Sequence, residues 1–376
     1  MDFDLTPDQR ELEALARRVA TEFRARAEEL QTSGEFPWAN MKRLGELGLL
    51  GVTIPEEYGG TGGNLMDAVI VLEQLAQGCY ITAMAVLGEI GVQSQVLLHY
   101  ASDTIKKRFL PGVVSGEKVL AICISEPEAG SDAGNMSTNA VKVEGGFKIN
   151  GGKVWISRAD VADLFILYTR FEGVPGSAGV GAVVVERGVP GFTVGRLDTT
   201  MAGESLGQLF FDDCFVPDEN LLVRKEGFKA MMSAFNGQRC LNSAICLGLA
   251  QGALDEAVSY AKQRRQFGKA IAEFQGLQWM LADMQIDIEA ARMLIYRAAT
   301  QTKDGFPLYH QAAIAKTFAN EMAIRVTNQA LQVHGTTGFI RGSYVERAVR
   351  GARFGGLGGG TPQILRNLIA RYMLRG

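Results

Sequence analysis

Apolar residues near the start of the chain recur at intervals of three and four, which predicts a first helix: Leu12, Leu15, Ala16 and Val19. Thr6 is placed to cap this helix, Pro7 suits its first turn, and Gln9 completes a capping box with Thr6. Helical spacing continues to about residue 115. It is interrupted at residues 55–63, PEEYGGTGG, whose glycines and turn residues predict a loop.

Between about residues 118 and 222 the pattern becomes that of strands. Segments such as KVLAICIS, FKINGGKVWIS, DLFILYTR and VGAVVVE are short, rich in β-branched residues and separated by glycine-rich turns. They predict an all-β unit, either a barrel or a sandwich.

Helical spacing returns after Asn220 and holds to the end of the chain. It forms two apolar stripes: Leu254, Ala257, Val258 and Ala261 in one, and Leu277, Leu281 and Met284 in the other. The order of helices, strands and helices predicts an α+β protein. We expect an N-terminal helical bundle over residues 1–117, a β-barrel or sandwich over 118–225, and a C-terminal helical bundle over 226–376.

The composition agrees with several packed units. A chain of 376 residues is too long for one ordinary core. Hydrophobic content of 47% with 21% charged residues is that of a well-buried globular protein. The formal net charge of -3 provides no overall positive field, so nucleic acid is not expected as a partner.

The N-terminal sequence and the cysteines indicate a cytoplasmic protein. The first residues, MDFDLTPDQR, carry acids early and no apolar core, unlike a signal or transit peptide. We see no run of about 18 apolar residues that would predict a membrane span. The five cysteines lack CxxC spacing, which is typical of a reduced chain, and the three histidines are too far apart for a metal site.

Five short motifs follow one another along the chain: SEPEAGSD at 125–132, KVWIS at 153–157, RRQFG at 264–268 together with FQGLQWMLADM at 274–284, QVHG at 332–335, and GTPQI at 360–364. In order and spacing they resemble motifs of the acyl-CoA dehydrogenase family, such as T-E-P-G-A-G-S-D, K-x-W-I-T/S and R-x-x-F-G. One such motif is weak evidence, but five in order cover nearly the whole chain.

The resemblance implies that the protein binds FAD. It implies that Ser125 and Ser157 hydrogen-bond the flavin ring and that Trp155 lies against the ring. Without the motif, Trp155 would be interpreted as a core aromatic residue and Arg264 as a solvated surface residue. The residues implied to contact FAD, of this subunit or a neighbour, are Ile122, Ile124, Ser125, Gly130, Ser131, Trp155, Ser157, Arg264, Phe267, Gln275, Gln332, Gly335, Thr361 and Gln363.

The resemblance also implies the substrate, the partners and the assembly. The substrate is an acyl-CoA or acyl-carrier thioester, contacted by Ser131, Asn236, Gln238 and Arg239. The electron partner is an electron-transferring flavoprotein. The C-terminal part is a four-helix bundle at the centre of a homotetramer, a dimer of dimers.

The family chemistry is α,β-dehydrogenation, in which a glutamate removes the proton alpha to the thioester while the beta hydrogen leaves as hydride. Most members carry this glutamate in a Y-E-G-T sequence near the C-terminus, where this chain has Gly359. A second subgroup carries it before an arginine early in the C-terminal bundle, where this chain has Gln238 before Arg239. Both usual positions of the base therefore lack a carboxylate.

Three explanations compete for the missing glutamate. The base has moved, in which case Glu89 is the candidate because apolar neighbours would raise its pKa; the alternative for Glu89 is an exposed surface residue. Alternatively, the flavin performs elimination, desulfination or oxygenation, or the chain is a non-catalytic subunit of a heteromeric enzyme. The glycine-rich run RFGGLGGGT, residues 353–361, favours an unusual or bulky acyl group, because glycines leave room beside the flavin.

Overall fold

The computed structural model describes residues 4–375 of the chain. These residues fall into two compact units. Unit 1 comprises the chain up to Ser33, Leu65–Met84, and the chain from Asn236 onward; unit 2 comprises Gly34–Asn64 and Ala85–Phe235. The three consecutive domains expected above remain a prediction, and their outer ends at residues 1–3 and 376 lie outside the described residues.

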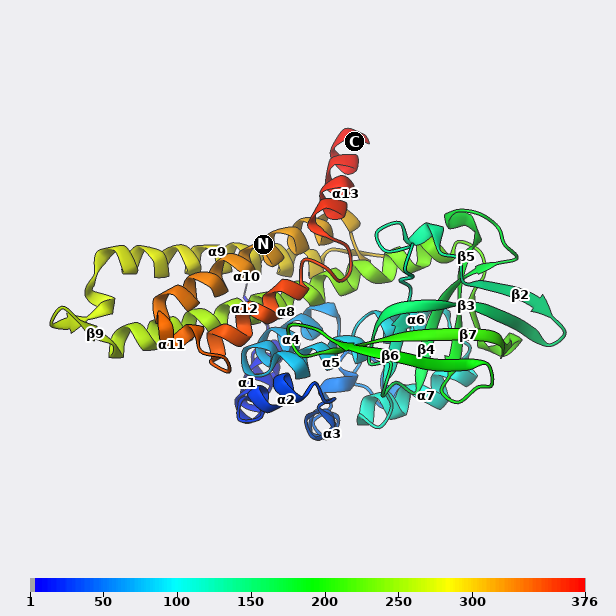
Figure 1. The fold of residues 1–376 in the computed structure, drawn as a ribbon, viewed down its shortest axis with the longest axis horizontal. Coiled ribbons are helices and arrows are strands. Elements are labelled where there is room, and N and C mark those ends of the chain that lie inside the picture. Colours follow the sequence, from blue (N-terminus) through cyan, green and yellow to red (C-terminus); the bar gives the residue numbers. More distant parts are fainter. Residues whose placement is uncertain (1–3, 376) are drawn as a thin grey trace. The chain divides into compact units, whose positions relative to one another are not determined.

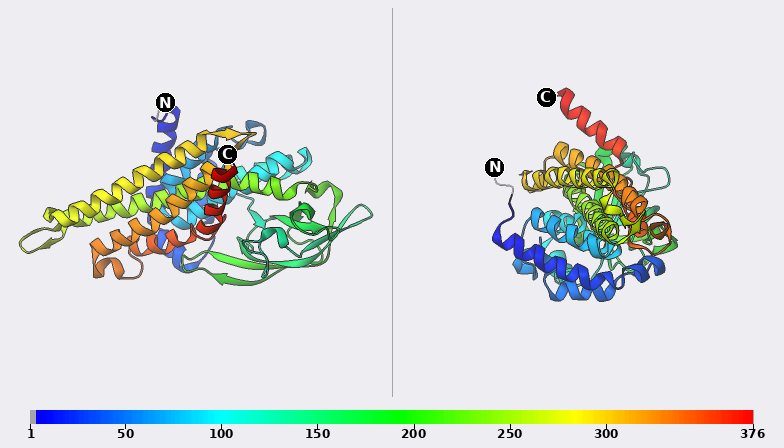
Figure 2. Two further views of the ribbon diagram at one scale, coloured as in Figure 1. Left: turned by 90° about the horizontal axis from the view of Figure 1, so that it is seen from above. Right: turned by 90° about the vertical axis from the view of Figure 1, so that its left-hand side faces the viewer.

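Unit 1 is mainly helical. Its elements are α1 (Pro7–Arg24), α2 (Ala27–Ser33), α4 (Leu65–Gly78), the start of α5 (Tyr80–Glu89), most of α8 (Gly227–Gln263), β9 (Arg265–Gln266), β10 (Lys269–Ala270), α9 (Gln275–Thr300), β11 (Thr302–Lys303), β12 (Phe306–Pro307), α10 (Tyr309–His334), α11 (Thr336–Phe339), α12 (Tyr344–Phe354) and α13 (Pro362–Arg375). The long helices α8, α9 and α10 run alongside one another (Figures 1 and 2).

The predicted start of the first helix is confirmed. The Oγ1 atom of Thr6 accepts a hydrogen bond from the backbone N–H of Gln9 at 3.2 Å, and the side chain of Gln9 accepts one from the backbone N–H of Thr6 at 3.2 Å. Ala16 and Val19 are buried, and α1 packs against α4. The capping residues therefore fix where the helix begins, and the apolar stripe fixes which face is buried.

Two small hairpins interrupt the helices that the sequence pattern predicted as continuous. Strands β9 and β10 pair around Phe267 and Gly268, and β11 and β12 pair around Asp304 and Gly305. All four turn residues have positive φ. Asp-Gly is a strong signal for a hairpin turn, so the second hairpin was detectable from the sequence but was not predicted.

Unit 2 combines short helices with a mixed sheet. Its helices are α3 (Trp38–Glu46), the end of α5, α6 (Val92–Tyr100) and α7 (Asp103–Ser115), with short 3-10 turns at Leu49–Gly51, Glu56–Tyr58, Ala133–Asn135, Ser177–Gly179 and Asp218–Asn220. Its strands are β1 (Leu120–Cys123), β2 (Asn139–Val143), β3 (Gly146–Ser157), β4 (Leu164–Phe171), β5 (Val180–Glu186), β6 (Phe192–Thr199), β7 (Ser205–Pro217) and β8 (Leu221–Val223).

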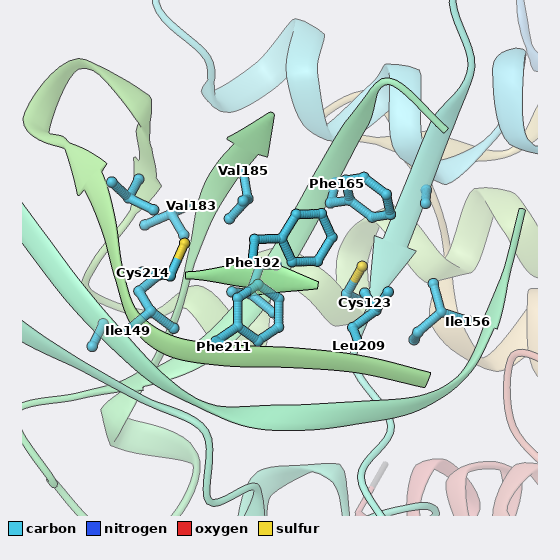
Figure 3. Close-up of a cluster of buried hydrophobic side chains, with 14 of the residues drawn as sticks. Cys123, Ile149, Ile156, Phe165, Val183, Val185, Phe192, Leu209, Phe211 and Cys214 are labelled. Atoms are coloured by element: carbon cyan, nitrogen blue, oxygen red, sulfur yellow. The ribbon is translucent and has the colours of Figure 1, made fainter. Parts of the chain in front are cut away.

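The eight strands form one sheet in the order β6-β7-β3-β2-β4-β5-β8, with β1 beside β4. Pairs β1–β4 and β2–β4 are parallel, and the remaining pairs are antiparallel. Register shifts within β3–β7 and β6–β7 are sites where a sheet bends. The sheet encloses one apolar core in which Phe165, Phe192 and Phe211 pack ring against ring, as the predicted β-unit requires (Figure 3).

One segment meets the length and hydropathy of a membrane span, which the sequence analysis did not expect. Tyr80–Tyr100 covers 21 residues with a mean hydropathy of 1.4, and 89% of its apolar window is buried inside the protein. It is divided into α5 and α6 at Ile90 and Gly91. Such burial is typical of a core helix, which is apolar on all sides because protein surrounds it.

Close packing between α1 and α4 generates a stability prediction. A Cβ atom on Gly78 would lie 2.0 Å from the backbone oxygen of Ala20, which cannot move without shifting α1. We expect Gly78→Ala to lower the free energy of unfolding by about 1–3 kcal/mol, measured by denaturant unfolding.

Gly276 in the first turn of α9 provides the control, because a Cβ atom there would meet no atom within 4 Å. We expect Gly276→Ala to leave stability unchanged or to raise it by up to about 1 kcal/mol through helix propensity. Equal stability of the Gly78→Ala protein and the unsubstituted protein would contradict the assigned packing.

Candidate functional site

Two of the predicted motifs meet in unit 2. The backbone N–H of Val154 donates to the carbonyl oxygen of Ser125 at 2.9 Å. The Nζ atom of Lys153 donates to the carbonyl oxygen of Ile124 at 2.9 Å and to the carboxylate of Glu126 at 2.8 Å. The segments 125–132 and 153–157 are therefore joined by a backbone bond from Val154 and by side-chain bonds from Lys153.

The ion pair between Lys153 and Glu126 is buried. The Glu126 carboxylate also accepts hydrogen bonds from the backbone of Ser137, at 2.5 Å, and of Thr138, at 3.0 Å. Burial by itself would raise the pKa of Glu126, but Lys153 and these donors lower it to about 2. Glu126 is therefore ionised at neutral pH and holds the loop that carries the first motif against β3.

This arrangement exposes Trp155. Its indole is 59% exposed and its backbone has a φ of 61°, in the left-handed region. The interpretation of Trp155 as a core aromatic residue is thereby excluded. A left-handed backbone at a non-glycine residue is strained and is found mainly at functional sites.

The other predicted flavin contacts of unit 2 precede or follow Trp155 in the sequence. Ser125, Ser157, Ile122 and Ile124 are half-buried, and Gly130 and Ser131 are exposed. Half-buried hydroxyls beside an exposed aromatic ring provide the donors, acceptors and flat apolar surface that a flavin ring requires. The residues present therefore fit the flavin that the motifs imply.

Glu89 lies at the end of α5 and is fully buried, so it is not the exposed surface residue considered as its alternative. Its Oε1 atom accepts from Nη1 of Arg158 at 3.2 Å and from the backbone N–H of Leu120 at 3.4 Å. Its Oε2 atom has no hydrogen-bond partner among the described residues. Burial raises the pKa of Glu89 to about 7, although Arg158 acts in the opposite direction.

Arg158 directly follows the second motif and has a positive φ of 63°. Besides Glu89, its Nη1 atom donates to the carbonyl oxygen of Ala85 at 3.0 Å. A Cβ atom on Gly88 would lie 1.6 Å from that nitrogen, so the guanidinium occupies the space that Gly88 leaves open. Glu89 and Gly88 together therefore position Arg158 next to Ser157.

In unit 1, five of the predicted FAD contacts lie at one end of the bundle: Arg264, Phe267, Gln275, Gln332 and Gly335. All five are exposed, and Phe267 is 92% exposed at the tip of the β9–β10 hairpin. The ends of α8 and α10 meet there, because the rings of Tyr260 and His334 stack with centroids 4.5 Å apart.

Thr361 and Gln363 lie elsewhere in unit 1, at the start of α13. Thr361 caps α13 by accepting from the backbone N–H of Ile364 at 3.3 Å. The adjacent Gly360 is bonded to Lys316, which precedes Gln332 on α10 by sixteen residues. At 1.5 Å per helical residue, the two sets of predicted FAD contacts are roughly 24 Å apart within one chain.

Three of the predicted substrate residues lie together in α8. The Nη1 atom of Arg239 donates to the side-chain oxygen of Asn236 at 2.6 Å, and Gln238 between them is half-buried. The Nε atom of Arg239 donates to the carbonyl oxygen of Gly359 at 3.3 Å. The fold therefore brings together the two positions, 238 and 359, at which the motif comparison expected a glutamate.

The structure reveals charged residues that the sequence analysis did not assign to the site. Glu126 and Lys153 were only parts of quoted motifs, and Arg158 carried no signal of its own. Lys316 did carry a sequence signal, since it is three or four residues from the buried Ala312, Ala313 and Ala319 on α10. A lysine within an apolar helical stripe is a candidate for a buried charge.

Family models cover nearly the whole chain. The acyl-CoA dehydrogenase N-terminal domain matches residues 6–117, the middle domain matches residues 121–214, and the C-terminal domain matches residues 225–374.

Individual proteins match at full length. A 3-sulfinopropanoyl-CoA desulfinase of Paraburkholderia xenovorans (strain LB400) is 41% identical, over 99% of this chain and 97% of its own. A short-chain specific acyl-CoA dehydrogenase of Clostridium acetobutylicum is 34% identical over 100% of both chains. The solved structure of butyryl-CoA dehydrogenase from Megasphaera elsdenii is 33% identical, covers 100% of both chains and has a TM-score of 0.95. The protein therefore belongs to the acyl-CoA dehydrogenase family, whose members are FAD-dependent oxidoreductases.

Proposed function

We propose that the protein uses FAD to oxidise an acyl thioester between its alpha and beta carbons, with an unusual or bulky acyl group and with Glu89 as a relocated base. The observation that supports this most directly is the junction of the two motifs in unit 2. Lys153 fixes the segments of Ser125 and Ser157 to each other and leaves Trp155 exposed beside them. That surface suits a flavin ring.

Bound FAD supplies the hydride acceptor. The chain's own contribution is orientation: the hydroxyls of Ser125 and Ser157 bind the polar edge of the ring, and Trp155 covers its flank. Ile122, Ile124, Gly130 and Ser131 complete the contacts of this unit. Arg264, Phe267, Gln275, Gln332 and Gly335, with Thr361 and Gln363, are proposed to hold the phosphates and the adenine.

The substrate is proposed to be a thioester of coenzyme A or of an acyl carrier, contacted by Ser131, Asn236, Gln238 and Arg239. We further propose a cytoplasmic location and an electron-transferring flavoprotein as the electron partner. The location is inferred from the five free, buried cysteines, and the electron partner from the family resemblance.

Glu89 is proposed as the group that takes the alpha proton. Burial raises its pKa to about 7, so at neutral pH it has substantial proton affinity and is still partly ionised. Its Oε2 atom has no hydrogen-bond partner within residues 4–375, so it has a free lone pair for a proton, while Arg158 and the backbone of Leu120 orient the other oxygen.

Desulfination is a second candidate function. The 41% identical protein of Paraburkholderia xenovorans is named a 3-sulfinopropanoyl-CoA desulfinase. If the sulfinate group leaves as sulfur dioxide, the electron pair of the broken C–S bond stays on carbon and takes up a proton from water, and the sulfur dioxide is hydrated to sulfite. This reaction needs no base at the alpha carbon. A chain with glycine at 359 and glutamine at 238 fits such a reaction as well as it fits a relocated base.

A panel of thioesters distinguishes the two functions. We expect purified protein to carry FAD and, in the absence of oxygen, a saturated acyl-CoA to bleach the flavin absorption band within one turnover. Under desulfination, 3-sulfinopropanoyl-CoA releases sulfite without net bleaching, and saturated acyl-CoAs leave the flavin oxidised. Protein that carries no flavin would contradict both functions.

The base is tested by Glu89→Gln. We expect the rate of flavin reduction to fall by about 100-fold or more, because a general base contributes on that scale. In the unsubstituted protein the rate should rise as pH passes through about 7, since only the ionised carboxylate accepts a proton. This rise should be lost in the variant, as followed by stopped-flow absorbance.

Glu73 provides a matched control for Glu89. It is also buried and paired with an arginine, Arg292 at 3.2 Å, but it belongs to unit 1, whereas Glu89 belongs to unit 2. Glu73→Gln should keep both the rate and the pH profile. An unchanged rate in Glu89→Gln would remove Glu89 as the base.

We propose that the chain assembles as a homotetramer, a dimer of dimers. The exposed side chains of Trp279, Ile286 and Met293 are spaced by seven residues on α9 and so lie on one helix face. An exposed apolar stripe of this kind is typical of a helix that packs against another chain. A second chain would also bring together FAD contacts that lie roughly 24 Å apart in one chain.

The assembly is tested by sedimentation. We expect the protein to have the mass of four chains and the double variant Trp279→Asp, Ile286→Asp to dissociate, because charges on the stripe oppose its burial. Val174→Asp is the control, since Val174 is exposed in a turn of unit 2. A monomeric unsubstituted protein, or an intact tetramer in the double variant, would contradict the proposal.

A further inference from the structure

The glycine-rich loop after α12 is held by cationic and amide donors of two other helices. The Nζ atom of Lys316 donates to the carbonyl oxygens of Gly355 at 2.7 Å and Gly360 at 3.0 Å. The side-chain amide of Asn320 also donates to Gly355, and Nε of Arg239 donates to Gly359 at 3.3 Å. The loop is therefore fixed and carries two positive charges on its inner side.

Two glycines of this loop allow neighbouring atoms to pack closely against the backbone. A Cβ atom on Gly355 would lie 2.5 Å from the sulfur of Cys246, and one on Gly358 would lie 2.7 Å from the ring of Phe354. Gly359 and Gly360 instead have positive φ values of 71° and 102°. Glycine is therefore required by packing at 355 and 358, and it is favoured by backbone conformation at 359 and 360.

Neither cation has a negative partner in the described part of the chain. Lys316 is fully buried and Arg239 is 4% exposed, and their hydrogen bonds run only to carbonyl oxygens and to Asn236. Burial lowers the pKa of Lys316 to about 8, with Arg239 acting in the same direction, and lowers that of Arg239 to about 10. Two like charges without a carboxylate are costly to bury.

The backbone at Gly360 leaves space for a side chain next to these charges. A Cβ atom on Gly360 would meet the side chain of Leu365 at 3.4 Å and Nη2 of Arg239 at 4.0 Å, which are ordinary contact distances. Nη2 makes no hydrogen bond to any described residue. A group placed beside Gly360 would therefore face two free guanidinium donors.

We propose that this space binds an oxyanion, such as a carboxylate, carried at the far end of a short acyl thioester. The oxyanion takes the place that a side-chain carboxylate at 359 or 238 would occupy and supplies the negative charge that Arg239 and Lys316 lack in the described part of the chain. This inference rests on the proposed thioester function and adds the substrate class: an acyl chain with an acidic terminus. The N–H groups on Nη2 of Arg239 are charged donors, and a hydrogen bond from a charged donor to a carboxylate is stronger than one between neutral groups.

A purely structural role for the two cations is the alternative. The loop follows the C-terminus of α12, whose partial negative charge offsets part of the charge of Lys316. It does not offset Arg239, which donates to only one carbonyl of the loop and keeps Nη2 free. The two roles differ in one measurable property, because only a ligand site makes binding depend on the charge of the acyl chain.

The experiment compares two inert thioethers of equal length on the FAD-loaded protein. S-(3-carboxypropyl)-CoA carries a terminal carboxylate, S-(4-methylpentyl)-CoA carries an isopropyl group of the same shape, and neither has the carbonyl needed for turnover. We expect calorimetry to give a Kd about 10- to 100-fold lower for the acidic ligand, the range of a hydrogen bond to a charged group.

Two variants assign this preference to Arg239. Arg239→Gln removes the charge, and Gln238→Glu keeps the charge but supplies a carboxylate within the chain. Each should reduce the preference to within about threefold. Gln238→Glu keeps the proposal testable if Arg239→Gln fails to fold. Arg325→Gln is the control, since Arg325 is an exposed α10 cation paired with Asp287 at 2.8 Å, and it should keep the preference.

The outcomes separate this inference from the proposed function. Equal binding of both ligands, or a preference that both variants retain, would overturn the oxyanion site and leave the thioester function standing. If free succinate competed for the site as well as the acidic thioether does, the proposal that the oxyanion is carried by an acyl thioester would be overturned. If the protein binds neither thioether and no thioester perturbs its flavin, the proposed function itself fails.

Discussion

The placement of charge away from water is the constraint on which the functional parts of this protein depend. A buried charge is costly unless it is paired or hydrogen-bonded, so each buried cation fixes the segments that supply its partners. Lys153 joins the two motif segments of unit 2 through Ile124 and Glu126. Arg292 joins α9 to α4 through Glu73. These ion pairs hold segments that lie far apart in the sequence.

The same constraint distinguishes two kinds of buried cation. Arg158 is compensated by Glu89, and Lys153 is compensated by Glu126. Among the described residues, Arg239 and Lys316 have only neutral acceptors, and they contact the loop where the motif comparison expects a glutamate. The missing carboxylate therefore has an electrostatic consequence beyond the missing base, because the positive charges of Arg239 and Lys316 stay uncompensated in the described part of the chain. A substrate that carries its own negative charge would compensate these charges.

Glu89 illustrates how much the surroundings of one residue change its chemistry. From the sequence it was equally compatible with a surface residue and with a base. Its complete burial and its bond to Arg158 exclude the surface residue, and burial raises its pKa toward neutrality. The left-handed backbone of Arg158 and the missing side chain of Gly88 are what allow that bond to form.

The amino-acid sequence by itself determined the order of helices and strands, the capped start of α1, and membership of the family, because these depend on local periodicity and short motifs. The hairpin turn at Asp304 and Gly305 was not predicted, but it too has a local signal in the sequence. Only the tertiary structure decided that positions 238 and 359 share one place, that Glu89 faces Arg158, and that Lys316 and Arg239 lack a carboxylate. The physical reason is that burial and charge compensation are set by residues distant in the chain, and no local pattern records which of them meet.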